Sequence, residues 1–133
     1  MIFSEVGLEA LKCTQGFRCK PCANVVGYGH QIVPGDGVVP NGDIITSSKA
    51  MELLKKDVVP VIGAVNNYVT STITQNQFDA VVILAYNLGI SVAAVVLRTI
   101  KAGDLIGAAE QFLILNRLVE HELFTTPDAP IDP

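Results

Sequence analysis

The sequence has few charged side chains and no excess of positive charge. Only 17% of its 133 residues are charged, and 13 Asp and Glu outnumber 9 Lys and Arg, which gives a net charge of −4. An acidic chain has no long-range attraction for polyanions such as nucleic acid or an anionic cell wall. The charge balance therefore excludes a nucleic-acid-binding protein and counts against a role in degrading cell walls.

The sequence also lacks a secretion signal and a long uninterrupted apolar run. Residues 1–5 contain neither a basic segment nor an apolar one, so we expect the protein to remain in the cytoplasm. A bilayer-spanning helix needs about 20 consecutive apolar residues. The longest apolar stretch, residues 78–97, is interrupted by Asp79, Asn87 and Gly89. We therefore expect two buried helices that meet at Gly89 and no membrane span.

The length and the high apolar content predict one domain with a single core. Half of the residues are hydrophobic, and a chain of this size buries roughly two thirds of the surface of its unfolded form. We expect the domain to cover residues 1–124. Residues 125–133 contain three prolines and no apolar period, so we expect a flexible tail there.

Helix-capping residues and apolar periodicity predict one strand region in a mainly helical chain. Residues 16–32 are expected to be extended, after a first helix that Ser4 caps and to which Val6 contributes part of the apolar side. Thr46 is expected to cap a second helix, and Pro60 to begin a separate third one.

The remaining helices are predicted from further caps. Thr74 and Gln77 form a capping box at the start of a helix that Gly89 ends. Ser91 and Asp104 are expected to cap the two helices that follow, the second of which continues to Leu123. A small strand lobe followed by a helical bundle is an α+β arrangement.

Several segments of the chain match one known family. From Gly7 the sequence reads GLEALKCTQGFRCKPCANVVGYGH, and TQNQFDAVVILAYNLG, KAGDLIGAAEQFL and HELF follow in that order. These segments resemble phage-type lysozymes, glycoside hydrolase family 24, over most of residues 4–124. The resemblance implies an α+β, mainly α, lysozyme-like fold with a small, truncated strand lobe. It also implies a muramidase that hydrolyses the bond between N-acetylmuramic acid and N-acetylglucosamine in peptidoglycan.

The catalytic positions of the family are altered in this chain. The family pattern is Glu, eight residues, Asp, five residues and Thr, with Gly-x-Gly-His close behind. The resemblance places Gln15 at the Glu and Asn24 at the Asp. Only Val25 and Val26 separate Asn24 from the Gly-x-Gly-His segment, where relatives have a longer insert that carries the Thr. A second shortening, after the segment AEQFL, leaves Asn116 close to the last helix, where relatives have a Gly-rich loop.

Loss of the two carboxylates bears directly on the chemistry. Glycosidases use one carboxylic acid to protonate the leaving oxygen and a second carboxylate on the opposite side of the sugar. An amide has no dissociable proton and no charge near neutral pH. Losing general acid catalysis alone typically costs about 10²–10⁴-fold in rate.

Three functions follow from this comparison. We predict first a catalytically inactive phage lysozyme homologue that binds a protein, such as a component of a host system, or a second copy of itself through an exposed apolar surface. The alternative is a peptidoglycan muramidase, an endolysin, as the resemblance implies. A second alternative is a module that binds peptidoglycan without hydrolysing it.

The three cysteines have two interpretations. Cys19 and Cys22 form a C-x-x-C pair, which with Cys13 and His30 gives a set of three thiolates and one imidazole for zinc. The spacing matches no common zinc finger, so we expect the cysteines to pack as small hydrophobes. We therefore expect no metal and no cofactor.

The resemblance assigns a structural role to His30. In the family this histidine pairs with an acid on the helix that follows, and Asp57 lies at the matching position. We therefore predict a pair of His30 and Asp57 that holds the strand lobe to the helical bundle.

Overall fold

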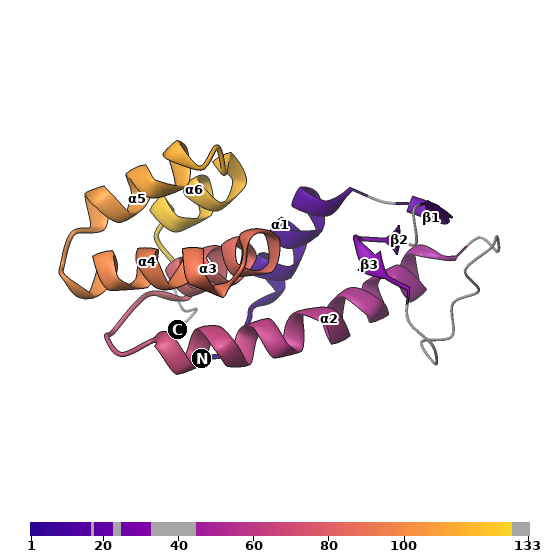
Figure 1. Ribbon diagram of the computed structural model, residues 1–133, viewed down its shortest axis with the longest axis horizontal. Helices are drawn as coiled ribbons and strands as arrows, with labels where there is room; N and C mark the ends of the chain where they lie inside the picture. The colour runs from indigo at the N-terminus through magenta and orange to yellow at the C-terminus, as the bar shows by residue number, and fades with distance from the viewer. Residues whose placement is uncertain (17, 23–24, 33–44, 129–133) are drawn as a thin grey trace, which may run out of the picture. The chain divides into compact units, whose positions relative to one another are not determined.

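The computed structural model describes residues 1–16, 18–22, 25–32 and 45–128 (Figure 1). Its order of elements is one helix, three strands and five further helices within those residues. The chain divides into two compact units. Residues 12–59 form the first, which contains the strands, and residues 1–11 with 60–133 form the second, which contains most of the helices.

The strand unit is built from a three-stranded antiparallel sheet and the first part of one helix. The strands are β1 (Arg18–Cys22), β2 (Val25–Gly27) and β3 (His30–Gln31), paired in the order β1-β2-β3. The strand region expected between residues 16 and 32 is present, but it is divided into three short strands, and Tyr28 and Gly29 form a turn between β2 and β3. The apolar core of this unit consists of Val26, Tyr28, Ile32, Ala50, Leu53, Leu54 and Val58, all buried.

The turn between β2 and β3 needs its glycines. Gly27 and Gly29 have φ values of +64° and +76°, which residues with a Cβ rarely adopt. A Cβ on Gly27 would also lie 2.9 Å from the Cβ of Ala50. The turn therefore packs directly onto the helix that carries Ala50.

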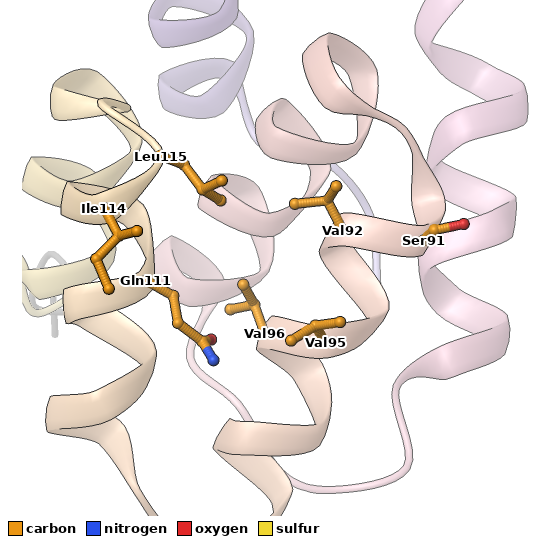
Figure 2. A pocket seen from close by; sticks show the side chains of 7 residues that line it. All are labelled: Ser91, Val92, Val95, Val96, Gln111, Ile114 and Leu115. Carbon is orange, nitrogen blue, oxygen red and sulfur yellow. The ribbon is translucent and has the colours of Figure 1, made fainter.

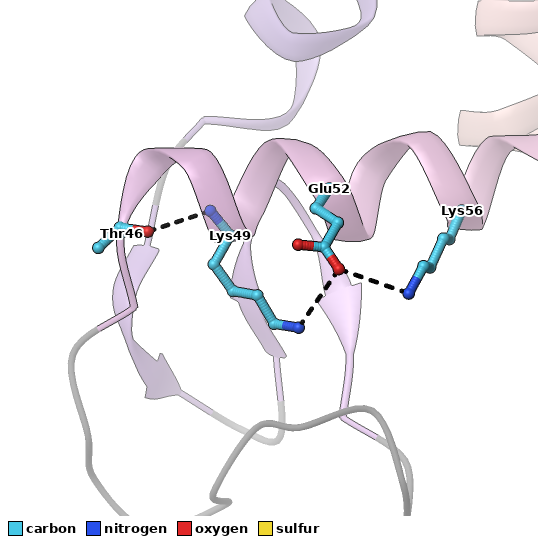
Figure 3. Close-up of polar contacts among 4 residues, drawn as sticks. All are labelled: Thr46, Lys49, Glu52 and Lys56. Carbon is cyan, nitrogen blue, oxygen red and sulfur yellow. Dashed lines mark hydrogen bonds and ion pairs between the residues drawn. The ribbon is translucent and has the colours of Figure 1, made fainter.

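That helix, α2 (Ser47–Tyr68), continues through Pro60. The expectation of a separate third helix beginning at Pro60 is wrong. A proline inside a helix lacks the N–H that would bond to the carbonyl four residues earlier. The apolar spacing nevertheless continues on both sides, with Leu54, Val58 and Val65 all buried, so burial of one continuous face offsets the missing bond. Thr46 caps this helix as expected, since its Oγ1 accepts a hydrogen bond from the Lys49 N–H at 3.1 Å (Figure 3).

The helical unit is organised around α3 (Gln75–Leu88). This helix contacts α4 (Ile90–Lys101) and α6 (Leu118–Thr125), and α5 (Leu105–Ile114) contacts both of those. Every residue from Phe78 to Ala85 is buried. This central part of α3 is buried on all sides, and all of its residues except Asp79 are apolar.

Most of the predicted helix ends in this unit are confirmed. Thr74 and Gln77 form the capping box of α3, and Gly89 ends that helix with its N–H bonded to the Ala85 carbonyl. Asp104 caps α5, since its side chain accepts a hydrogen bond from the Gly107 N–H. These interactions join residues within one turn, which is why the sequence alone predicts them.

Three details of the helices differ from expectation. Ser91 does not cap α4, because the chain passes through Gly89, at a φ of +98°, directly into a helix that begins at Ile90. The helix α5 ends at Ile114 and does not continue to Leu123, because Asn116 adopts a φ of +58° that interrupts it. Val6 is exposed on α1 (Glu5–Gln15), where Gly7, Leu8 and Leu11 form the buried side.

None of the described helices is long and apolar enough to cross a bilayer. Residues 125–128 are the described part of the tail that was expected to be flexible, and each of them forms a hydrogen bond. Asp128 accepts hydrogen bonds from the N–H groups of Gln75 and Asn76, at 3.0 and 2.8 Å, at the N-terminus of α3. Residues 129–133 lie outside the described residues.

Asp79 is a buried carboxyl group that ties the N-terminal segment to α3. Its Oδ1 accepts hydrogen bonds from the Ser4 N–H at 3.2 Å and from Gln75 Nε2 at 2.8 Å, and its Oδ2 accepts one from the Ser4 hydroxyl. Burial raises the pKa of Asp79 above its usual 3.8, although the hydrogen bonds from Ser4 oppose this change. A Cβ on Gly7 would lie 2.7 Å from the Asp79 carboxyl carbon, so this contact requires glycine.

The raised pKa of Asp79 predicts a pH-dependent loss of stability. As the pH rises above about 4, the carboxyl ionises in the unfolded chain before it ionises in the folded protein, so the folded protein loses relative stability. Asp79→Asn removes this titration and keeps an oxygen for Ser4 and Gln75. We expect the free energy of unfolding of Asp79→Asn, relative to the unmodified protein, to increase between pH 4 and pH 7 in urea titrations. An unchanged difference over that range would show that Asp79 titrates normally.

Candidate functional site

Gln15, which the resemblance assigns to the family's acid position, lies at the end of α1 against the turn that carries the Gly-x-Gly-His segment. Its Nε2 donates a hydrogen bond to Thr14 Oγ1 at 3.2 Å. A Cβ on Gly29 would collide with Gln15 Oε1, so the glycine allows this close approach. Residues 14 positions apart in the sequence are thereby brought into one site within the strand unit.

The Gln15 side chain is an amide and cannot supply the proton that glycoside cleavage needs. Two carboxylates lie in the described part of residues 12–59, Glu52 and Asp57, and both are ion-paired. Glu52 pairs with Lys49 and Lys56 at 3.8 and 3.5 Å, as Figure 3 shows. Asp57 pairs with His30. These ion pairs do not bring either carboxylate next to Gln15.

The predicted pair of His30 and Asp57 is present. The His30 Nδ1 atom lies 2.7 Å from Asp57 Oδ2, His30 is buried, and Asp57 is partly exposed. Both residues lie within the strand unit, so the pair joins β3 to the first part of α2. The pair orients the imidazole ring of His30, which is the last residue of the Gly-x-Gly-His segment.

The other predicted site residues are described only in part. Asn24 lies outside the described residues, and the side chains of Cys19 and Cys22 on β1 do as well. Cys13 is exposed and forms no disulfide, so the expectation that it packs as a hydrophobe is wrong, because α1 turns a different side toward the core. No group of three potential metal ligands is found among the residues that the structure describes.

An apolar hollow that the sequence did not predict lies on α4 and α5 (Figure 2). It has a volume of about 320 Å³, and its lining consists of Ser91, Val92, Val95, Val96, Gln111, Ile114 and Leu115. Within the described residues, Gln111 Oε1 is a buried acceptor without a hydrogen-bond partner. Ile114 is 81% exposed at the edge of this hollow. The sequence does contain a sign of this hollow. The helices α4 and α5 have more apolar residues than are needed to form one buried face each.

Comparison with known proteins gives a consistent match along the chain. The family model described as Phage lysozyme matches residues 6–123. An endolysin of Acyrthosiphon pisum secondary endosymbiont phage 1 is 31% identical over 120 residues, which cover 85% of this chain and 79% of that protein. The chain spans less than half of the length of endolysins from two Bacillus phages that it also matches, 46% and 36%.

Two solved structures share the fold over nearly their whole length. The muramidase domain of SpmX from Asticaccaulis excentricus has a TM-score of 0.80 and 31% identity, and the match covers 95% of this chain and 99% of that one. An endolysin from Escherichia coli O157:H7 phage FAHEc1 has a TM-score of 0.84 and 26% identity, with 98% of each chain covered. The expected lysozyme-like α+β fold is therefore confirmed.

Proposed function

This chain belongs to the phage lysozyme family, and on that premise we propose that it acts on bacterial peptidoglycan as a muramidase whose turnover is limited by Gln15. The reaction of the family is hydrolysis of the bond between N-acetylmuramic acid and N-acetylglucosamine. The observation that carries the proposal is the contact of Gln15 with Gly29. It holds the side chain at the family's acid position against the Gly-x-Gly-His turn.

The chemistry at Gln15 separates glycan binding from cleavage. The amide has an N–H that can donate a hydrogen bond to a glycosidic oxygen, but it cannot transfer a proton to that oxygen. Binding of the glycan therefore depends little on the exchange of carboxyl for amide, whereas the rate falls by about 10²–10⁴-fold when a general acid is lost. We expect a protein that retains glycan affinity and hydrolyses slowly.

A second candidate function is supported by a different part of the molecule. Large apolar side chains are exposed on the helical unit between residues 95 and 119, namely Val95, Leu105, Ile106, Leu113, Ile114, Leu115, Leu118 and Val119. Exposed apolar patches on a soluble domain commonly mark an interface. A catalytically inactive homologue that binds a protein, or a second copy of itself, is therefore the alternative.

Co-sedimentation with purified peptidoglycan, followed by measurement of released reducing ends over many hours, tests the proposal. We expect saturable binding with slow release above a heat-inactivated sample of the same protein, while an intact endolysin serves as the positive control. Binding without any release would instead identify a non-hydrolytic peptidoglycan-binding module. Absence of binding by the folded protein would overturn the proposal and favour the second candidate.

A further inference from the structure

The apolar hollow on α4 and α5 contains one polar atom that lacks a hydrogen-bond partner. We refer to it as the α4–α5 hollow, and it lies wholly within the helical unit. The side chain of Gln111 extends into it from α5 toward Val96 on α4, as Figure 2 shows. The Oε1 atom of Gln111 is buried, and none of the described residues donates a hydrogen bond to it.

Two hydrogen bonds fix the orientation of this amide group. Its Nε2 atom donates to Thr99 Oγ1 on α4 at 3.0 Å, and the Thr99 hydroxyl donates in turn to the Val95 carbonyl at 3.1 Å. Because its one hydrogen is committed to Val95, the Thr99 hydroxyl can only accept a hydrogen bond from Gln111. The amide nitrogen therefore faces Thr99, and the amide oxygen is the atom left without a donor.

A water molecule is poorly suited to supply that donor. Most buried polar atoms in native proteins are paired, and a buried water usually has about two to four polar partners. The only other polar residue in the lining is Ser91, five residues before Val96 and therefore roughly 7.5 Å away along the axis of α4. Figure 2 shows its hydroxyl pointing away from Gln111. The rest of the lining is aliphatic, namely Val92, Val95, Val96, Ile114 and Leu115.

The hollow is uncharged and small. No Lys, Arg, Asp or Glu is among the described residues that line it, which disfavours an ionic ligand, because a charge removed from water needs a partner. Its volume of about 320 Å³ is at the lower end of the range for small-molecule sites. A water molecule takes up about 30 Å³ in the liquid. The hollow therefore has room for a ligand of about ten groups of that size.

A ligand reaches Gln111 Oε1 only when side chains at the rim of the hollow move, because the atom is shielded from solvent. Ile114 lies at this rim and is 81% exposed, whereas Val96 is buried. Fewer contacts therefore hold the Ile114 side chain, and exposed side chains change rotamer within nanoseconds. The rim thus offers little resistance to a ligand that enters from solvent.

We propose that the α4–α5 hollow binds a small neutral alcohol with an aliphatic body. The hydroxyl of the alcohol donates to Gln111 Oε1, and its carbon chain contacts the valines of α4 and Ile114 of α5. The free acceptor selects a molecule with a donor, and the uncharged lining selects a neutral one. This site is independent of the proposed activity at Gln15, which lies in the other unit.

Titration of the full chain with 1-hexanol, followed by NMR amide shifts, tests the site. Methyl pentyl ether is an isomer of 1-hexanol without a donor and serves as the matched ligand. We expect saturable shifts centred on Val92, Val96 and Leu115, and binding of the alcohol about tenfold tighter than binding of the ether. Gln111→Leu keeps the size of the side chain and removes the acceptor, so it should weaken binding of 1-hexanol to the level of the ether. Equal affinity of the unmodified protein for both ligands would overturn the proposal.

Two isoleucines of α5 provide a matched pair of variants. Ile114 lines the hollow, whereas Ile106 is 77% exposed on the same helix and is not part of the lining. Ile114→Ala should weaken binding of both ligands several-fold because it removes apolar contact area, and Ile106→Ala should weaken neither.

Three further results would contradict the proposal. The first is an equal effect of Ile114→Ala and Ile106→Ala, and the second is the absence of saturable binding of 1-hexanol by the folded protein. The third is a shift of the same amides when the protein concentration is raised without ligand, which would assign the hollow to a second copy of the chain.

Discussion

Gln15→Glu is expected to raise the rate of peptidoglycan hydrolysis by at least about 10²-fold over the unmodified protein. The variant introduces a carboxylic acid at the end of α1, where the present side chain already contacts Gly29. Glutamate and glutamine have nearly the same size, so the new carboxyl group takes the place of the amide. The added chemistry is a proton that can be transferred to the leaving oxygen.

The measurement is the release of reducing ends from purified peptidoglycan as a function of pH. Gln31→Glu is the matched control, because it makes the same chemical change at an exposed position on β3 in the same unit. The double variant Gln15→Glu, Asn24→Asp adds the second carboxylate of the family pattern and should be faster again. If Gln15→Glu is folded and no faster than Gln31→Glu, a carboxyl group at position 15 is not sufficient for cleavage, and another essential part of the site is absent.

Arg117→Met is expected to lower the free energy of unfolding by about 3 kcal/mol, at the lower end of the range for breaking a buried ion pair. The Arg117 Nε atom lies 2.5 Å from Glu120 Oε2, and the Glu120 side chain is 1% exposed. Removing the arginine leaves a buried carboxylate without its cation. The arginine itself is partly exposed, which is why the lower end of the range applies.

Urea unfolding of two further variants makes this prediction specific. Lys56→Met removes one lysine of the exposed pair with Glu52 and should cost less than about 1 kcal/mol. The double variant Arg117→Met, Glu120→Leu replaces both partners with apolar groups and should recover most of the lost stability. Equal effects of Arg117→Met and Lys56→Met would mean that the pair contributes no more than a surface contact. The pair lies where α5 passes into α6, so its loss also tests how this connection is held.

The sequence by itself determined the features that depend on a few neighbouring residues. The capping box of Thr74 and Gln77, the end of α3 at Gly89 and the cap at Asp104 were all predictable because each bond closes within one helical turn. The family resemblance also predicted the contact between His30 and Asp57, although these residues are 27 positions apart in the sequence. The amide at Gln15 is likewise a property of the sequence, because chemical identity does not depend on folding.

Only the tertiary structure decided which local tendencies prevail. Pro60 is a local signal for a break, yet α2 continues through it because one buried face extends over both sides. Cys13 and Val6 are apolar by type, yet they lie on the exposed side of α1. The contact of Gln15 with Gly29 brings together residues from separate elements. Burial and proximity depend on how whole elements pack, and no short segment of sequence contains that information.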